Sequence, residues 1–139
     1  GLPGDKIKIV NGEIYLNNNI ILRKKMKDFI DRDKNSSTKR ARKYKEYLDD
    51  LTFDVLDIMD NGIADNTKLF VVPEDYFFVM GDNRDNSQDS RFKTVGFIPI
   101  NNLVGKARFI FFSLENSRFL EIWKWPKAIR GSRIFTTIK

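Results

Sequence analysis

The chain has 139 residues, which suits one domain, and its 41% of hydrophobic residues, including 12 Phe and 2 Trp, can bury a core. It has no histidine and no cysteine, which excludes Ser-His-Asp and Cys-His catalysis, thiolate nucleophiles, disulfides and sulfur-ligated metals. A hydrolase of this composition needs a lysine, a carboxylate or a residue outside the chain as its base.

The formal charge of +6 is concentrated in one segment. Residues 23–45 hold 11 basic and 3 acidic residues, while the remaining 14 basic and 16 acidic residues sum to −2. A nucleic-acid-binding fold would carry its positive charge through the structured elements, so we expect no nucleic-acid partner. The basic segment fits either a solvated excursion or a contact with anionic lipid headgroups.

Turn signals and period-two alternation predict short antiparallel strands at the start of the chain. The Asn11-Gly12 dipeptide is a strong signal for a two-residue hairpin. In chain order, the expected elements are a strand at 6–10, the hairpin turn, a return strand at 13–16, a turn at 17–19 and a strand at 20–22.

The basic region 23–50 allows two interpretations. Its first apolar residues, Leu22, Met26, Phe29 and Ile30, fit one face of a helix, and they equally fit a distorted strand with charged outer positions. The polar run at 35–38 ends whichever element precedes it.

From residue 51 onward the pattern predicts further strands. Residues 51–55 alternate and Leu56 and Ile58 then take the opposite phase, which indicates a strand with a bulge, followed by a turn at 60–62. The remaining expected strands are 69–72, 76–80 and a strand pair or one long bent strand within 103–112. The fold class predicted is mainly β, with antiparallel sheets and one charged insertion.

Residues 81–91 form a polar block between two apolar segments, with three carboxylates, two guanidiniums and two serine hydroxyls. A calcium loop is disfavoured, because the EF-hand spacing fails and two arginines would repel the ion. Carboxylate–guanidinium pairs could instead pin the backbone and hold Ser87 and Ser90 at fixed positions. A fixed neutral hydroxyl can orient a catalytic lysine without stabilising its charged form.

The block resembles the most characteristic motif of the bacterial type I signal peptidases, membrane-bound serine endopeptidases with a Ser–Lys dyad. Their motif G-D-N-R-D-N-S-x-D-S-R agrees with residues 81–91 at all ten specified positions, and the opening residues 1–5 are similar to a second motif, G-x-P-G-D. Residues 69–134 contain further similar stretches, and 23–60 align with a segment that varies in the family. The resemblance implies antiparallel sheets of the signal-peptidase catalytic-domain type.

The resemblance also implies roles for the block. Ser87 would hydrogen-bond the lysine base and orient its amine. Asp89 and Arg91 would form an ion pair that supports the site, and Asp82 would be a further structural carboxylate. Arg84, Asp85 and Asn86 would brace the loop, and Gly81 would keep the backbone close to the dyad.

The chain departs from the family pattern in the two catalytic blocks and in the N-terminal membrane anchor, which is absent as well. The S-x-S-M-x-P block with the nucleophile and the lysine before G-x-P-G-D have no counterpart here, and Lys6 lies on the wrong side of the turn. We therefore expect residues 1–139 to be the C-terminal part of a single periplasmic catalytic domain, with 23–50 as a variable basic insertion. Alone, this part is expected to be inactive.

The implied parent enzyme removes signal peptides from exported proteins at the outer face of the bacterial cytoplasmic membrane. We expect signal peptides and membrane lipids as partners, a monomer, and no cofactor or metal. The alternative is a truncated, non-catalytic homologue that binds signal peptides or the membrane. If the genomic sequence upstream of the codon for Gly1 encodes an in-frame serine block, lysine block and hydrophobic anchor, the chain is part of the enzyme and not a truncated homologue.

Overall fold

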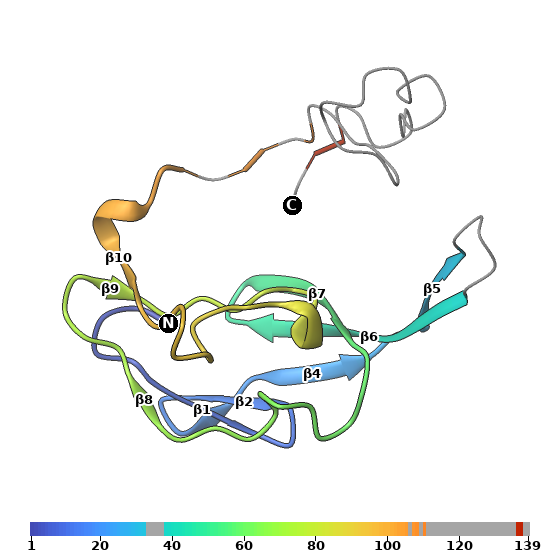
Figure 1. Cartoon of the computed structure of the whole chain (residues 1–139), viewed down its shortest axis with the longest axis horizontal. Coiled ribbons are helices and arrows are strands. Elements are labelled where there is room, and N and C mark those ends of the chain that lie inside the picture. The colour runs from blue at the N-terminus through green and yellow to red at the C-terminus, as the bar shows by residue number, and fades with distance from the viewer. Residues whose placement is uncertain (33–37, 106, 109, 111–135, 138–139) are drawn as a thin grey trace. The chain divides into compact units, whose positions relative to one another are not determined.

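A computed structural model describes residues 1–32, 38–105, 107–108, 110 and 136–137, and in it the fold is mainly β with antiparallel sheets, as expected (Figure 1). The two helices assigned within these ranges are short 3₁₀ turns, and none of the helices described is long and apolar enough to cross a membrane. The elements are β1 (Lys6–Val10), β2 (Glu13–Leu16), β3 (Asn19–Ile20), β4 (Leu22–Lys25), β5 (Phe29–Arg32), β6 (Thr38–Leu48), β7 (Leu51–Asp57), β8 (Phe70–Val71), β9 (Tyr76–Phe77), η1 (Arg84–Asn86), β10 (Ile98–Pro99) and η2 (Ile100–Asn102).

The first sheet has the strand order β3-β2-β1-β8 and carries the core. The predicted hairpin between β1 and β2 is confirmed: Asn11 and Gly12 have φ of 50° and 77°, the left-handed values that a type I′ turn requires. The alternation predicted for 6–10 is confirmed as well, since Ile7 and Ile9 are buried between exposed lysines. The core cluster consists of Ile7, Ile9, Ile14, Val72 and Phe78.

The described residues of the basic region, 23–32 and 38–50, form a second sheet and not a helix. Strand β6 is its centre, with β4 and β7 along one part of the strand and β5 along another. The strand interpretation of 23–50 therefore holds.

The bulge predicted at 51–58 is wrong. Strand β7 pairs with β6 residue for residue, from Leu51 opposite Leu48 to Asp57 opposite Arg42. The phase of the apolar residues changes because Asp57 takes the inward position, where Arg23 and Arg42 pair with it, and leaves Leu56 on the other face. A buried ion pair thus replaced the apolar residue that the pattern required.

Strands β8 and β9 confirm the strands predicted near 69–72 and 76–80, and both precede the polar block in the chain. The chain divides into two compact units, residues 1–103 and 104–139. Four residues of the strand expected at 103–112 (106, 109, 111 and 112) lie outside the described residues, and no strand is assigned to the six that are described. In the second unit, the Ile110 N–H donates a backbone hydrogen bond to the Thr136 carbonyl at 2.9 Å. The assignment of one domain with an insertion stays a prediction.

Candidate active-site support loop

The Asp89–Arg91 ion pair expected from the sequence is present and almost completely buried. Arg91 donates through Nε and Nη2 to the two oxygens of Asp89, both at 2.8 Å, and the two side chains are 2% and 5% exposed. Asp89 also accepts the N–H of Gly81 at 2.9 Å, and Arg91 donates to the carbonyl of Arg84 at 2.6 Å. Burial alone would raise the pKa of Asp89, but the hydrogen bonds from Arg91 and Gly81 hold it below its ordinary value. The pair therefore ties both ends of the loop together.

A second buried ion pair joins the loop to strand β6. Arg84 donates to both carboxylate oxygens of Glu46, with Nη1 at 2.7 Å from Oε1, and the two side chains are 9% and 6% exposed. A bidentate pair fixes both the position and the plane of the guanidinium. Sequence reasoning missed Glu46, because its partner lies 38 residues further along the chain and only the strand register brings the two together.

Ser87 lies directly after the 3₁₀ turn and is held from two sides. Its Oγ donates to the carbonyl of Asn83 at 2.7 Å. On the other side it packs against Gly81: a Cβ on that glycine would lie 1.9 Å from Ser87 Oγ and 2.5 Å from Ser87 Cβ. Glycine is therefore required at position 81 by the close approach of Ser87.

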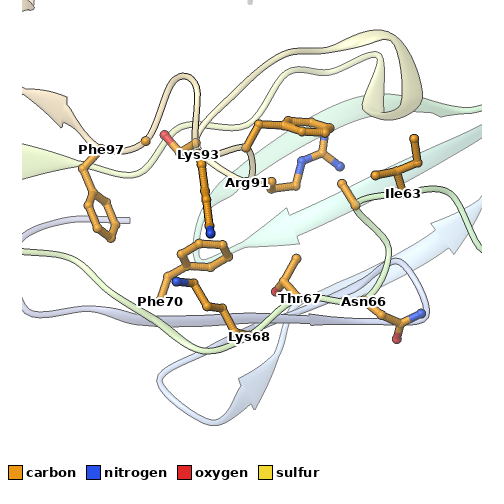
Figure 2. A pocket seen from close by; sticks show the side chains of 12 residues that line it. Ile63, Asn66, Thr67, Lys68, Phe70, Arg91, Lys93 and Phe97 are labelled. Atoms are coloured by element: carbon orange, nitrogen blue, oxygen red, sulfur yellow. The ribbon is translucent and has the colours of Figure 1, made fainter.

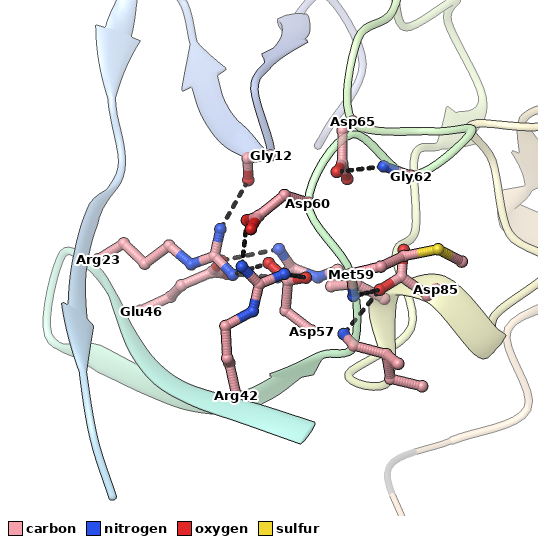
Figure 3. Close-up of polar contacts among 12 residues, drawn as sticks. Gly12, Arg23, Arg42, Glu46, Asp57, Met59, Asp60, Gly62, Asp65 and Asp85 are labelled. Carbon is pink, nitrogen blue, oxygen red and sulfur yellow. Dashed lines mark hydrogen bonds and ion pairs between the residues drawn. The ribbon is translucent and has the colours of Figure 1, made fainter. Parts of the chain in front are cut away.

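The remaining block residues anchor the loop to its surroundings. Asp85 accepts the backbone N–H groups of Ile58 and Met59 at 2.7 and 3.1 Å (Figure 3). Ser90 is buried, and its Oγ accepts the N–H of Val79 at 3.0 Å. Asp82 is exposed, and its backbone carbonyl, not its carboxylate, accepts the Leu56 N–H. Asn86 is exposed too.

An apolar pocket of about 250 Å³ opens beside Gly81. It could not be read from the sequence, because strands β1, β2, β6 and β7 each contribute to it. Its walls are mostly aliphatic and aromatic, with Gly81, Asp82 and Arg84 at one side. The apolar lining residues include Ile7, Ile14, Leu16, Phe53, Val55, Phe78 and Met80.

A second cavity of about 390 Å³ lies beside Arg91 (Figure 2). Phe70 and Phe97 form an apolar wall, and the side chains of Lys68 and Lys93 extend along it. Ser90 and Arg91 of the block line this larger cavity, whereas Gly81, which packs against Ser87, lines the apolar pocket. We therefore assign the support loop to the apolar pocket.

Next to the loop, a charge cluster connects β4, β6 and β7 (Figure 3). The Asp57 carboxylate pairs with Arg23 Nη2 at 2.5 Å and with Arg42 Nη2 at 2.9 Å, and Arg42 also pairs with Asp60. The guanidinium of Arg23 lies 3.6 Å from the ring centroid of Tyr44. The cluster fixes the strands that supply one wall of the apolar pocket.

Asp65 is a buried carboxylate without an arginine partner among the hydrogen bonds described. It is 6% exposed and accepts the Gly62 N–H at 2.7 Å. Burial raises the pKa of Asp65, and the nearby Asp57 and Asp85 add to this increase. The fold therefore disfavours the ionised form of Asp65 compared with the unfolded chain.

Asp65→Asn is expected to stabilise the protein at neutral pH, because the amide keeps an oxygen for Gly62 and removes the charge. The folded state binds the Asp65 carboxyl proton more tightly than the unfolded state does. The loss of stability caused by ionised Asp65 therefore grows as the pH rises from the ordinary carboxyl pKa through the raised pKa. Urea unfolding of both proteins across pH should show an advantage of Asp65→Asn that shrinks as the pH falls. Asp50→Asn, at an exposed turn, is the control for removing a carboxylate at the surface. An advantage of Asp65→Asn that grows in acid would contradict the assignment.

Comparison with known proteins agrees on one family. The sequence model described as signal peptidase, peptidase S26, matches residues 1–112. The chain is 35% identical over 155 aligned positions to a signal peptidase I of Rickettsia typhi, covering 99% of the chain and 57% of that relative. It is 34% identical to one of Rickettsia bellii, covering 99% and 52%, and 33% identical to one of Rickettsia prowazekii, covering 99% and 57%. The chain thus spans little more than half the length of these relatives.

Proposed function

The chain belongs to the signal peptidase family, peptidase S26, and on this premise we propose that it is the C-terminal part of a signal peptidase I that removes signal peptides from exported proteins. The main observation that supports this proposal is the 81–91 block, which holds Ser87 between Gly81 and the Asn83 carbonyl. In this proposal Ser87 is a positioning residue. The nucleophilic serine and the lysine base belong to a part of the protein outside residues 1–139.

The backbone around Gly1 supports this placement of the base. Gly1 and Phe78 exchange two hydrogen bonds, at 2.8 and 3.0 Å, as a hydrogen-bonded antiparallel pair does. On the other side of the same segment, the N–H groups of Val79 and Gly81 bond to loop side chains. A strand that continued the pairing before Gly1 would therefore run alongside Met80 towards Gly81. The lysine that precedes the G-x-P-G-D motif in the family would then reach the neighbourhood of Ser87.

The hydrogen bonding of Ser87 suits it to orient a lysine amine. Its O–H proton is already given to the Asn83 carbonyl, so its oxygen lone pairs are left to accept an N–H of the lysine. This bond directs the amine's own lone pair elsewhere, towards the serine nucleophile. The neutral amine then takes the serine proton while the serine oxygen attacks the scissile carbonyl, and water later hydrolyses the acyl-enzyme.

The remaining features of the proposal follow from the same premise. The apolar pocket beside Gly81 would accept the small apolar side chains that precede the cleavage site. Asp89 with Arg91, and Arg84 with Glu46, would keep the loop rigid during the reaction, because neither pair can move without exposing a buried charge. The protein would act as a monomer at the outer face of the bacterial cytoplasmic membrane, in contact with its lipids.

Ser87→Ala in the full-length enzyme is expected to lower kcat by about tenfold or more, because the base loses its orientation while the fold survives. The pH dependence of kcat should change as well, since the hydroxyl contacts the titrating amine. Steady-state cleavage of a signal-peptide substrate across pH measures both. Ser90→Ala is the contrasting variant: its hydroxyl holds the Val79 backbone, so stability should fall without that change in pH profile. Unchanged turnover in Ser87→Ala would contradict the role.

A further inference from the structure

The sheet of β4, β6 and β7 has an outer face that is both basic and apolar. In the register, Leu22 of β4 lies opposite Tyr47 of β6 and Lys24 opposite Lys45, and Lys45 in turn lies opposite Asp54 of β7. Alternation puts Lys43 on the same face, and it puts Arg23, Arg42 and Asp57 of the charge cluster on the other. The outer face is thus defined by Leu22, Lys24, Lys43, Lys45, Tyr47 and Asp54.

The positive charge of the outer face is only partly neutralised. Asp54 pairs with both Lys43 and Lys45, at 2.7 and 2.9 Å, so two ammonium groups share this one carboxylate. Within the described residues, no carboxylate pairs with Lys24, which lies directly opposite Lys45. Like charges facing each other across a ladder destabilise it. An external anion would relieve this repulsion.

Exposed apolar side chains lie among these lysines. Leu22 on the outer face is 66% exposed, and Phe29, which pairs with Ala41 two residues before Lys43, is 45% exposed. Met26, between them in sequence, is 38% exposed. A nucleic acid would engage the lysines but leave Leu22 and Met26 in water. At a lipid surface, the ammonium groups meet phosphates and the apolar side chains enter the boundary with the acyl chains.

We propose that this outer face binds the surface of an anionic lipid bilayer. This contact would leave the apolar pocket accessible, because the outer face and the pocket lie on opposite sides of β6. Glu46, on the opposite side from Lys45, pairs with Arg84 of the support loop and lines the apolar pocket. A bilayer against the outer face therefore does not cover the pocket. The inference depends on the proposed function only in supposing that the protein works at a membrane.

The test is co-sedimentation of the protein with phosphatidylcholine vesicles, with and without phosphatidylglycerol. We expect binding only where phosphatidylglycerol is present. Each lysine at such a surface contributes enough for about a fivefold change in affinity, so Lys24→Gln with Lys45→Gln should weaken binding about thirtyfold. The matched control is Lys6→Gln with Lys8→Gln, which removes two exposed lysines from β1 and should leave binding unchanged. Circular dichroism checks that each variant keeps its β structure. If the double variant unfolds, Lys24→Gln alone is tested instead, and its affinity for the anionic vesicles should be about fivefold lower.

Three outcomes would overturn the proposal. The first is equal binding to vesicles with and without phosphatidylglycerol, and the second is an equal loss in the β1 control, which would make net charge responsible. The third is tighter binding to a single-stranded oligonucleotide than to the anionic vesicles at the same ionic strength. The proposed peptidase function is tested separately, by measuring whether the full-length enzyme cleaves a soluble signal peptide. Face-specific vesicle binding without cleavage would leave the lipid surface in place and remove the peptidase assignment.

Discussion

Replacing Asp89 with alanine is expected to destabilise the protein by about 3–5 kcal/mol, the cost of leaving one partner of a buried ion pair alone. Arg91, 2% exposed, would keep its charge without a carboxylate, and the Gly81 N–H would lose its acceptor. Urea unfolding measures the loss. The pKa of Asp89 is held low in the fold. The stabilisation by ionised Asp89 is therefore present above the ordinary carboxyl pKa and disappears as the pH falls through the pKa of Asp89 in the folded protein. The difference between parent and variant should therefore shrink in acid.

The control for Asp89 is an ion pair of the same chemistry at the surface. Arg40 pairs with Asp28 at 2.7 Å, but its side chain is 74% exposed, so Arg40→Ala should cost at most about 1 kcal/mol. Should Asp89→Ala fail to fold, Asp89→Asn, which keeps an oxygen for the Gly81 N–H, should retain part of the stability. Equal effects of Asp89→Ala and Arg40→Ala would show that burial does not distinguish the two pairs.

Gly81→Ala is the second substitution with a large expected effect, because its methyl group would occupy the position of Ser87. Overpacking of this kind costs about 1–3 kcal/mol. In the full-length enzyme, kcat should fall at least about tenfold, since displacing Ser87 has the same consequence as removing its hydroxyl. Urea unfolding and signal-peptide cleavage give the two readouts.

A double-mutant cycle isolates the clash from other effects of the alanine. Ser87→Gly removes both atoms that the new Cβ would meet, at 1.9 and 2.5 Å, so Gly81→Ala should cost little stability in that background. Gly105→Ala is the control, because no atom lies within 4 Å of a Cβ built there. If Gly81→Ala costs the same with and without the Ser87 side chain, the close approach is not the reason for the glycine.

Local chemistry in the sequence was enough to predict the first hairpin. Asn11-Gly12 permits two consecutive left-handed residues, and the alternation of 6–10 fixes which side of β1 is buried. The same holds within the support loop, where Asp89 and Arg91 are two residues apart and their pairing needs no distant element.

The basic sheet could not be predicted, because both sides of β6 are polar. Its inward side chains, such as Arg42 and Glu46, find charged partners on other elements, and its outward lysines face solvent, so no hydrophobic period marks a strand. The partner of Arg84 was missed because it lies 38 residues away in the chain. Asp57 misled the sequence interpretation of β7, since an inward carboxylate broke the apolar alternation that a strand normally shows.

Strand β6 limits how this chain can change length in evolution. One added or lost residue between Lys43 and Glu46 would shift the side chains beyond it to the opposite side of the sheet. With an added residue, Lys45 would face Arg84 and two cations would meet where a buried pair now exists; with a lost residue, Tyr47 would take that position. In both cases Glu46 would point to solvent and Arg84 would lose its carboxylate. Insertions and deletions within 43–46 should therefore be absent from homologous chains that keep Arg84, or occur as pairs of residues.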